Sequence, residues 1–502
     1  MKKKVLAAIL VAVSITVNLA FYVPVSAQKL SHVDIERMVA EEINSGNMIQ
    51  YVVDLCNGTM GPEGERLWNP RTQGTPYGEA SNAYILEKFE EWGLDEIGIF
   101  ENPSARDWYY LKMWNVSIED FSFSATWPCR WSAAGDFEGE LVYVGEGTSD
   151  GDYEGKDVED KIVLADGRAR SVYRLAVEKY NASGILTDSP NLEGFYTTWA
   201  LCDSIPFGSE GIGITISYMD GQELKGLLDN GPVTVHIDVD AEVTHNTSKS
   251  VIGTIRGRTN SERYVLVVGH ADADAGNMGA DDNASGIAVL MEMARALMKL
   301  IKEGKIPRPN FSIKFMSVGT EISDTWAYIE AHEEELNNII AVINFDECGY
   351  GGWADVLYFE GNDIPVPFKS YGWFIPKVTL QPLMNALNDV GRDYVGIYWD
   401  EYTTNPFLGG SDHQPYVQVG VPATIIWTDA WWMPEPIEQP KKWGGGEILL
   451  DACPYYHSSG DTPANTVLVE PWNMEWGARS GAIAVLRLAL CRTSLHAASG
   501  GG

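Results

Sequence analysis

The stretch Val265–Gly286, VLVVGHADADAGNMGADDNASG, decides which fold the rest of the sequence indicates. Val265–Val268 is an unbroken apolar run, which predicts a strand covered on both faces of a sheet. His270 follows at the C-terminal end of this strand, where open α/β sheets place their ligands. A loop rich in Gly, Ala and Asp then leads to a helix start at Asn283–Gly286.

Two carboxylates accompany His270 in this stretch. Asp272 follows it by two positions and Asp282 by twelve. A histidine and a carboxylate are zinc ligands, and a second carboxylate beside a ligating histidine holds its ring and tautomer. Alone, the stretch is as compatible with a Gly- and Asp-rich turn as with a metal site, so the remaining sequence has to decide.

Further metal-binding side chains follow downstream, each at a strand end or in a loop. Glu321 follows the strand-like segment Phe311–Ser317, Asp346 ends the apolar run Ile339–Phe345, and His457 lies in the segment YYHSSGD. Together with the first stretch they make two histidines and three carboxylates. Such a set can hold two metals if one carboxylate bridges them, and paired metals clamp the attacking and leaving oxygens of a hydrolysis.

These side chains stand in sequence blocks that resemble metallopeptidase family 28, the co-catalytic zinc aminopeptidases and their carboxypeptidase relatives. The blocks follow the family's order over most of Arg263–Pro463: GHADADAG with GADDNASG, FMSVGTE, INFDE, GGSDHQPYVQVGVPA and YYHSSGDTP. The resemblance implies two Zn²⁺ per chain. It assigns His270 and Asp346 to one zinc, Glu321 and His457 to the other, Asp282 as the bridge, and Asp272 as the partner of His270.

The same resemblance adds two candidates for catalysis. His413, in the block GGSDH, would orient the substrate, and the phenol of Tyr456 would donate to the developing oxyanion. The alternative for Tyr456 is a hydrogen-bonded position beside the metal ligands.

Thr320 departs from the family pattern, which carries Gly-Glu-Glu where this sequence has Gly319-Thr320-Glu321. The first Glu is the general base of the family, and a Thr hydroxyl cannot accept a proton near neutral pH as a carboxylate does. Either Asp324 or Glu347 substitutes as the base, or Glu321 is the base and one metal is lost, or catalysis is weak. We favour Glu321 as a ligand, because Gly319 and the preceding strand fix its register.

Strand-like segments alternate with helical ones in the second half of the chain, which favours an α/β fold with a mostly parallel central sheet flanked by helices. A polar helix is expected at Tyr328–Asn337. Before this core, short strands over Ala133–Ala241 resemble the protease-associated domain that many family members insert, and we expect a small β-rich lid. The expected organisation is a signal peptide over 1–27, the first part of the catalytic domain over 28–132, the protease-associated domain over 133–241, the zinc peptidase core over 242–495 and a flexible tail over 496–502.

The N-terminus reads as a secretory signal, with Lys2–Lys4, an apolar stretch and the small residues Val25-Ser26-Ala27; an uncleaved membrane anchor is the alternative. The formal charge of −34 argues against nucleic acid or anionic membrane as a partner. The six cysteines are scattered, with no Cys-x-x-Cys to suggest a thiolate zinc site, and Cys348 with Cys453 is the candidate bridge near the centre.

The sequence therefore predicts a secreted, extracellular or periplasmic, zinc-dependent exopeptidase that acts on peptides, most simply an aminopeptidase. One alternative is a catalytically weak or inactive homologue that binds peptides. Another is a carboxypeptidase or a one-metal glutaminyl cyclase on the same core. A carboxypeptidase needs a cation for the terminal carboxylate, and the core offers few candidates, such as Arg392 and Lys377.

Overall fold

The computed structural model describes residues 30–57, 71–188, 204–273, 276–350 and 455–490, with shorter pieces over 357–361, 367–370, 373–375, 380–395, 399–403 and 410–428 and the single residues 377 and 453. The expected signal peptide and the tail lie outside these residues. Within the described part of the chain, no helix is both long and apolar enough to cross a membrane.

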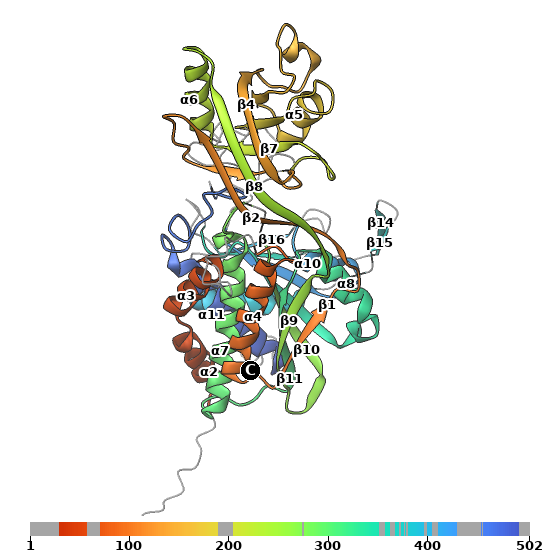
Figure 1. Ribbon diagram of the computed structural model, residues 1–502. Helices are drawn as coiled ribbons and strands as arrows, with labels where there is room; N and C mark the ends of the chain where they lie inside the picture. The colour runs from red at the N-terminus through yellow and green to blue at the C-terminus, as the bar shows by residue number, and fades with distance from the viewer. Residues whose placement is uncertain are drawn as a thin grey trace, which may run out of the picture.

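The lower body in Figure 1 is built on an eight-stranded sheet whose central strands are parallel. β10 (Asn260–His270) pairs in parallel with β11 (Phe311–Val318) on one side and with β12 (Ile339–Phe345) on the other. The second half of β10 is completely buried, because its apolar side chains are covered on both faces. The remaining strands extend the sheet in the order β1-β9-β11-β10-β12-β17-β13-β16, with bounds β1 (Glu96–Glu101), β9 (Lys249–Ile255), β17 (Ala423–Trp427), β13 (Leu357–Gly361) and β16 (Trp399–Thr403).

Helices cover both faces of this sheet (Figure 1). α7 (Gly286–Lys302) is apolar on nearly every side, since it packs against the sheet and against the neighbouring helix α11 (Pro471–Ala489), which also contacts the sheet. The same face carries α2 (His32–Glu42), α3 (Ser45–Asn57) and α4 (Pro76–Trp92). The opposite face carries α8 (Ser323–Ala331) and α10 (His413–Gln418). The smaller elements of this body are α9 (Gln381–Val390) and the hairpin of β14 (Phe368–Ser370) with β15 (Trp373–Ile375).

The upper body in Figure 1 has its own seven-stranded sheet, in the order β2-β8-β4-β5-β6-β7-β3, and its own apolar core. β2 (Arg106–Ile118) and β8 (Thr234–Asn246) are long antiparallel strands that run from the lower body into the upper one. The other elements are β3 (Thr126–Pro128), β4 (Gly135–Tyr143), β5 (Ile162–Ala165), α5 (Ala169–Ala176), β6 (Gly184–Thr187), β7 (Ile212–Ile216) and α6 (Tyr218–Leu228).

The expected α/β fold, with a mainly parallel centre and helices on both faces, is confirmed. The upper sheet also takes in β2 and β3, which precede residue 133; its assignment as a protease-associated domain stays a prediction. The prediction of one continuous helix over Tyr328–Asn337 is wrong, because α8 ends at Ala331 and a 3₁₀ helix follows over Glu333–Asn338. His332 leaves the helical region with φ −128° and ψ 33°, which separates the two.

Candidate metal centre

Three predicted ligands lie at the C-terminal edge of the parallel strands. His270 is the last residue of β10, Glu321 follows β11 and Asp346 follows β12. Parallel pairing aligns these strand ends, since His270 pairs with Val318 of β11 and β12 lies alongside in the same direction. One ligand atom from each of the three side chains lies within 4.8 Å of the other two. The strand register therefore brings together residues that are far apart in the sequence.

Asp282 contacts both histidines with different oxygens. Its Oδ1 lies 3.2 Å from Nε2 of His270, and its Oδ2 lies 2.9 Å from Nε2 of His457. Asp282 belongs to a short, irregular helical turn, Ala280–Ser285, that precedes α7. A carboxylate that offers one oxygen to each side is placed as a bridging ligand would be.

Asp272 contacts the His270 ring at Nδ1, on the side away from the other proposed ligands. Its Oδ1 lies 3.2 Å from Nδ1 of His270, so the opposite ring atom, Nε2, faces Asp282 and Asp346. The same Oδ1 accepts a hydrogen bond from the backbone N–H of Glu321 at 3.1 Å. One carboxylate thus orients a ligand on β10 and the chain that follows β11, which is the arrangement expected of a carboxylate that supports a metal-bound histidine.

The electrostatics of the cluster favour a bound cation. Burial raises the pKa of Glu321 well above its ordinary value, against the charge of His270 and with the help of Asp346, Asp412 and Asp282. Burial alone would lower the pKa of His270, but the charges of Asp346 and Glu321 raise it well above its usual range. Several carboxylates are therefore crowded in a place with little solvent, and a divalent cation would relieve their repulsion.

The donor set fits zinc. Imidazole nitrogens and carboxylate oxygens are ordinary ligands of Zn²⁺. Oδ1 of Asp346 is buried and lies 3.3 Å from Nε2 of His270, yet it has no hydrogen-bond partner among the described residues. An imidazole nitrogen and a carboxylate oxygen at this separation suit two ligands of one cation.

Ser411 and Asp412 fix the loops that carry two of the ligands. The Ser411 hydroxyl donates to Oδ2 of Asp346 at 2.5 Å. Oδ1 of Asp412 accepts from the backbone N–H of Ile322 at 2.8 Å and from the Thr325 hydroxyl. Sequence reasoning placed their block, GGSDH, on the substrate side of the centre and missed this supporting role.

Asp461 and Asp281 hold the turn around Asp282. The two oxygens of Asp461 accept from the backbone N–H groups of Asp281 at 2.8 Å and Asp282 at 3.1 Å. Asp281 in turn accepts from the backbone N–H groups of Gly349 and Tyr350. The turn is thereby tied to the His457 loop and to the chain after Asp346. The sequence signal for these roles was a location inside the blocks GADDNASG and YYHSSGDTP, which resemble the family.

Thr320 occupies the position where the family carries a carboxylate. Its hydroxyl is buried and has no hydrogen-bond partner among the described residues. The predicted substitute Asp324 is buried and accepts hydrogen bonds from Asn102, Ser248 and the backbone N–H of Thr320. These contacts use Asp324 to anchor the loop. Glu347, the other predicted substitute, is buried on the chain that follows Asp346, and its carbonyl accepts from Thr428.

The two remaining candidates differ in their placement. Tyr456 stacks on the ring of ligand His457, with ring centroids 3.8 Å apart. His413 is fully buried at the start of α10, and neither ring nitrogen has a hydrogen-bond partner among the described residues. Burial lowers the pKa of His413 to about 3, so the ring is neutral.

The suggested disulfide is wrong, because Cys348 carries a free thiol.

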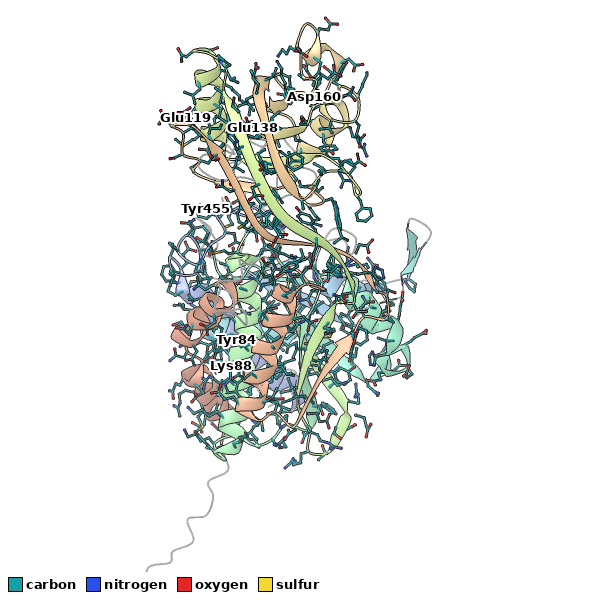
Figure 2. The ribbon with its side chains drawn as sticks, viewed as in Figure 1. Tyr84, Lys88, Glu119, Glu138, Asp160 and Tyr455 are labelled. Atoms are coloured by element: carbon teal, nitrogen blue, oxygen red, sulfur yellow. The ribbon has the colours of Figure 1, made fainter. Side chains whose placement is uncertain are left out.

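The centre faces the upper body. Tyr455, two residues before His457, lies where the two bodies meet (Figure 2). A Cβ added to Gly276, in the loop after His270, would lie 2.9 Å from the ring of Trp127 on β3. The upper body therefore packs directly on the loop between His270 and Asp282.

An α/β sheet with histidine and carboxylate side chains at the ends of its parallel strands is typical of metalloenzymes. Comparison with known proteins indicates which family of metalloenzymes this chain resembles. Residues 250–480 match the family model described as peptidase family M28. Leucine aminopeptidase 2 of Arthroderma otae is 26% identical over 254 residues, which are 50% of this chain and 47% of that protein. Probable leucine aminopeptidase 2 of Aspergillus fumigatus is 24% identical over 410 residues, 80% of this chain and 76% of that one.

Solved structures share the fold. The zinc aminopeptidase BSAP from Bacillus subtilis superposes with a TM-score of 0.57 at 19% identity, covering 89% of this chain and 95% of that one. The chain spans about half the length of the first curated relatives that it matches. Over residues 250–480, the chain is similar to peptidase family M28.

Proposed function

We propose that the protein is a zinc-dependent metallo-exopeptidase, specifically an aminopeptidase that removes N-terminal residues from peptides. The observation that carries the proposal is the convergence of two histidines and three carboxylates at one edge of the sheet: His270, Asp282, Glu321, Asp346 and His457. The names of the relatives, which are leucine aminopeptidases, support the direction of cleavage. Secretion belongs to the proposal as well, and it rests on the signal-like pattern of residues 1–27.

Two zinc ions, when bound, supply Lewis acidity at the scissile carbonyl and lower the pKa of a bound water. His270 and Asp346 would hold one ion and Glu321 and His457 the other, with Asp282 shared. The protein's own contribution is positioning: Asp272 orients the His270 ring, Ser411 fixes Asp346, and Asp461 fixes the turn of Asp282. The excess negative charge around the centre would attract the free amino terminus of a peptide.

Removal of metal tests this proposal directly. We expect the protein to hydrolyse leucine-type chromogenic amides, a chelator to abolish the activity, and added Zn²⁺ to restore it. Metal content measured in the same samples should rise to two Zn²⁺ per chain as activity returns. Absence of turnover at every metal loading would rule out the enzyme and leave a peptide-binding homologue as the function.

Thr320 predicts that this activity is low. With Glu321 as a ligand and Asp324 anchoring the loop, Thr320 leaves its position in the sequence without a carboxylate. Thr320→Glu should therefore raise kcat by roughly 10²- to 10⁴-fold, the usual contribution of a positioned general base. Thr320→Gln, of the same length but without a basic carboxylate, is the matched control and should stay at the level of the natural protein. Equal rates for all three would mean that another group already acts as the base.

The placement of Arg106 is a specific observation in favour of the alternative function, a carboxypeptidase. Its guanidinium lies 4.0 Å from the Trp108 ring centroid, and it forms no ion pair with a carboxylate of the described residues. Burial lowers the pKa of Arg106 against the opposing charges of Asp324 and Asp272, so the cation lies within electrostatic reach of the partner of His270. The cations expected from the sequence fit less well: Arg392 pairs with Asp389, and Lys377 is exposed. Peptides blocked at either end separate the two activities, because an aminopeptidase needs the free amine and a carboxypeptidase the free carboxylate.

A further inference from the structure

Arg71 is a buried cation outside the ligand set, and its side chain is only 1% exposed. It precedes α4 and lies 200 residues before Ala271, whose carbonyl it binds. A charged side chain is costly to bury unless its donors are satisfied. Here three donors of the guanidinium bind backbone carbonyls of one loop.

The guanidinium donates hydrogen bonds to both ends of the loop that joins His270 to the turn of Asp282. Its Nε donates to the carbonyl of Ala271 at 2.6 Å, Nη1 to that of Met278 at 2.5 Å, and Nη2 to that of Gly279 at 2.9 Å. Ala271 directly follows ligand His270, and Gly279 lies three residues before ligand Asp282. One rigid group therefore sets the separation between the two chain segments that carry these ligands.

The loop is shaped to receive this group. Gly279 has φ +55°, a conformation that other residues adopt at a cost, and a Cβ there would lie 2.7 Å from Nη2 of Arg71 and 2.4 Å from the carbonyl of Asp282. Cys56 of α3 donates to the same Met278 carbonyl at 3.4 Å. From the other side, Asp461 accepts the backbone N–H groups of Asp281 and Asp282. Arg71 thus binds the carbonyl side of this segment and Asp461 the N–H side.

We propose that Arg71 is a positioning residue for the metal centre, holding His270 and Asp282 at their binding separation through the loop carbonyls. This inference rests on the metal centre of the proposed function. A guanidinium suits the task because it is planar, permanently charged and carries five donors in a fixed fork, whereas the ammonium of lysine cannot reach three carbonyls in that geometry.

The test uses Arg71→Lys in the full chain, with Arg487→Lys as the matched control. Arg487 is also buried, but it pairs with Glu36 in the interface of α11 with α2 and touches no residue of the centre. We expect Arg71→Lys to weaken Zn²⁺ binding by about 10- to 100-fold, the effect usual for residues that support metal ligands, in a competition titration against a chromogenic chelator. Arg487→Lys should bind Zn²⁺ like the natural protein, although it unfolds at a lower temperature.

Hydrogen exchange of the metal-free proteins gives a second measurement that does not depend on activity. Amides in 271–282 should exchange faster in Arg71→Lys than in the natural protein and in Arg487→Lys. If Arg71→Lys does not fold, Gly279→Ala, which keeps Arg71 but forces the loop away from it, should show the same loss of Zn²⁺ affinity. Natural Zn²⁺ affinity in a folded Arg71→Lys, or in Gly279→Ala where it replaces that variant, overturns the role of Arg71. Failure of the natural protein to bind Zn²⁺ would instead overturn the proposed function.

Discussion

At the scale of single residues, the charged groups of this protein are buried in two different ways. Around the centre, carboxylates are grouped so that a cation can bind. In the upper body, Asp188 is buried after β6 with Nζ of Lys225 at 3.1 Å, and the same Nζ contacts Asp166 at 2.6 Å. The first group is placed where the proposed function needs a metal ion, whereas the second is an internal ion pair whose effect is on stability.

Asp188 should make the stability of the upper body depend on pH. Burial raises the pKa of Asp188 to about 6 although Lys225 opposes the shift, while an unfolded Asp titrates near ~3.9. The folded form therefore binds the proton more tightly, so stability present below pH ~4 is lost as the pH rises through about 6. Asp188→Asn should flatten that fall in the unfolding temperature, followed by circular dichroism. The exposed Asp157→Asn is the control, and curves that run parallel for all three proteins would contradict the assignment.

At the scale of elements, α11 packs so closely on the sheet that its Gly481 has no room for a larger side chain. A Cβ on Gly481 of α11 would lie 2.3 Å from Cζ of Phe345, the last residue of β12 and the neighbour of ligand Asp346. Gly481→Ala should therefore destabilise the lower body by about 1–3 kcal/mol through overpacking. Gly226→Ala in α6 is the control, since nothing lies within 4 Å of that site and alanine favours a helix by roughly 0.5–1 kcal/mol. Scanning calorimetry measures both, and a stabilised Gly481→Ala would show that α11 can move.

The elements near the centre were predictable from the sequence, because runs of apolar residues indicate buried strands. β10, β11 and β12 are apolar runs that end in polar ligands, and α4 ends at Gly93, which adopts the left-handed conformation with φ +62°. α6 was not predicted, although Ser217 caps it by accepting from the N–H of Asp220. Its segment follows β7 directly, and its Gly residues weaken the helical pattern.

At the scale of the whole molecule, the closeness of the proposed ligands could be predicted from the sequence, but the supports that lie far away in the chain could not. Ligands stand in short blocks with recognisable spacing. Arg71 acts on carbonyls 200 residues away, and Asp461 on N–H groups about 180 residues away. A contact with backbone carries no side-chain signature in the partner segment, so no local pattern announces it. The position of the upper body over the loop after His270 likewise follows from long-range packing, as at Trp127 and Gly276.

The charge of the whole molecule should select among substrates by their charge. With 36 basic and 70 acidic residues, the formal charge is −34, and the proposed centre adds a local concentration of carboxylates. Such a field concentrates cations near the centre, and salt screens it over about 10 Å at 0.1 M. We therefore expect kcat/KM for a positively charged leucine peptide to fall several-fold as sodium chloride is raised. A peptide of the same length with two glutamates should show the opposite trend, because screening removes its repulsion. Initial rates at fixed pH and saturating Zn²⁺ measure both peptides, and an uncharged leucine amide analogue corrects for general effects of salt. Identical salt slopes for the two charged peptides would mean that substrate reaches the centre without sensing the field, and that local contacts alone set the selectivity.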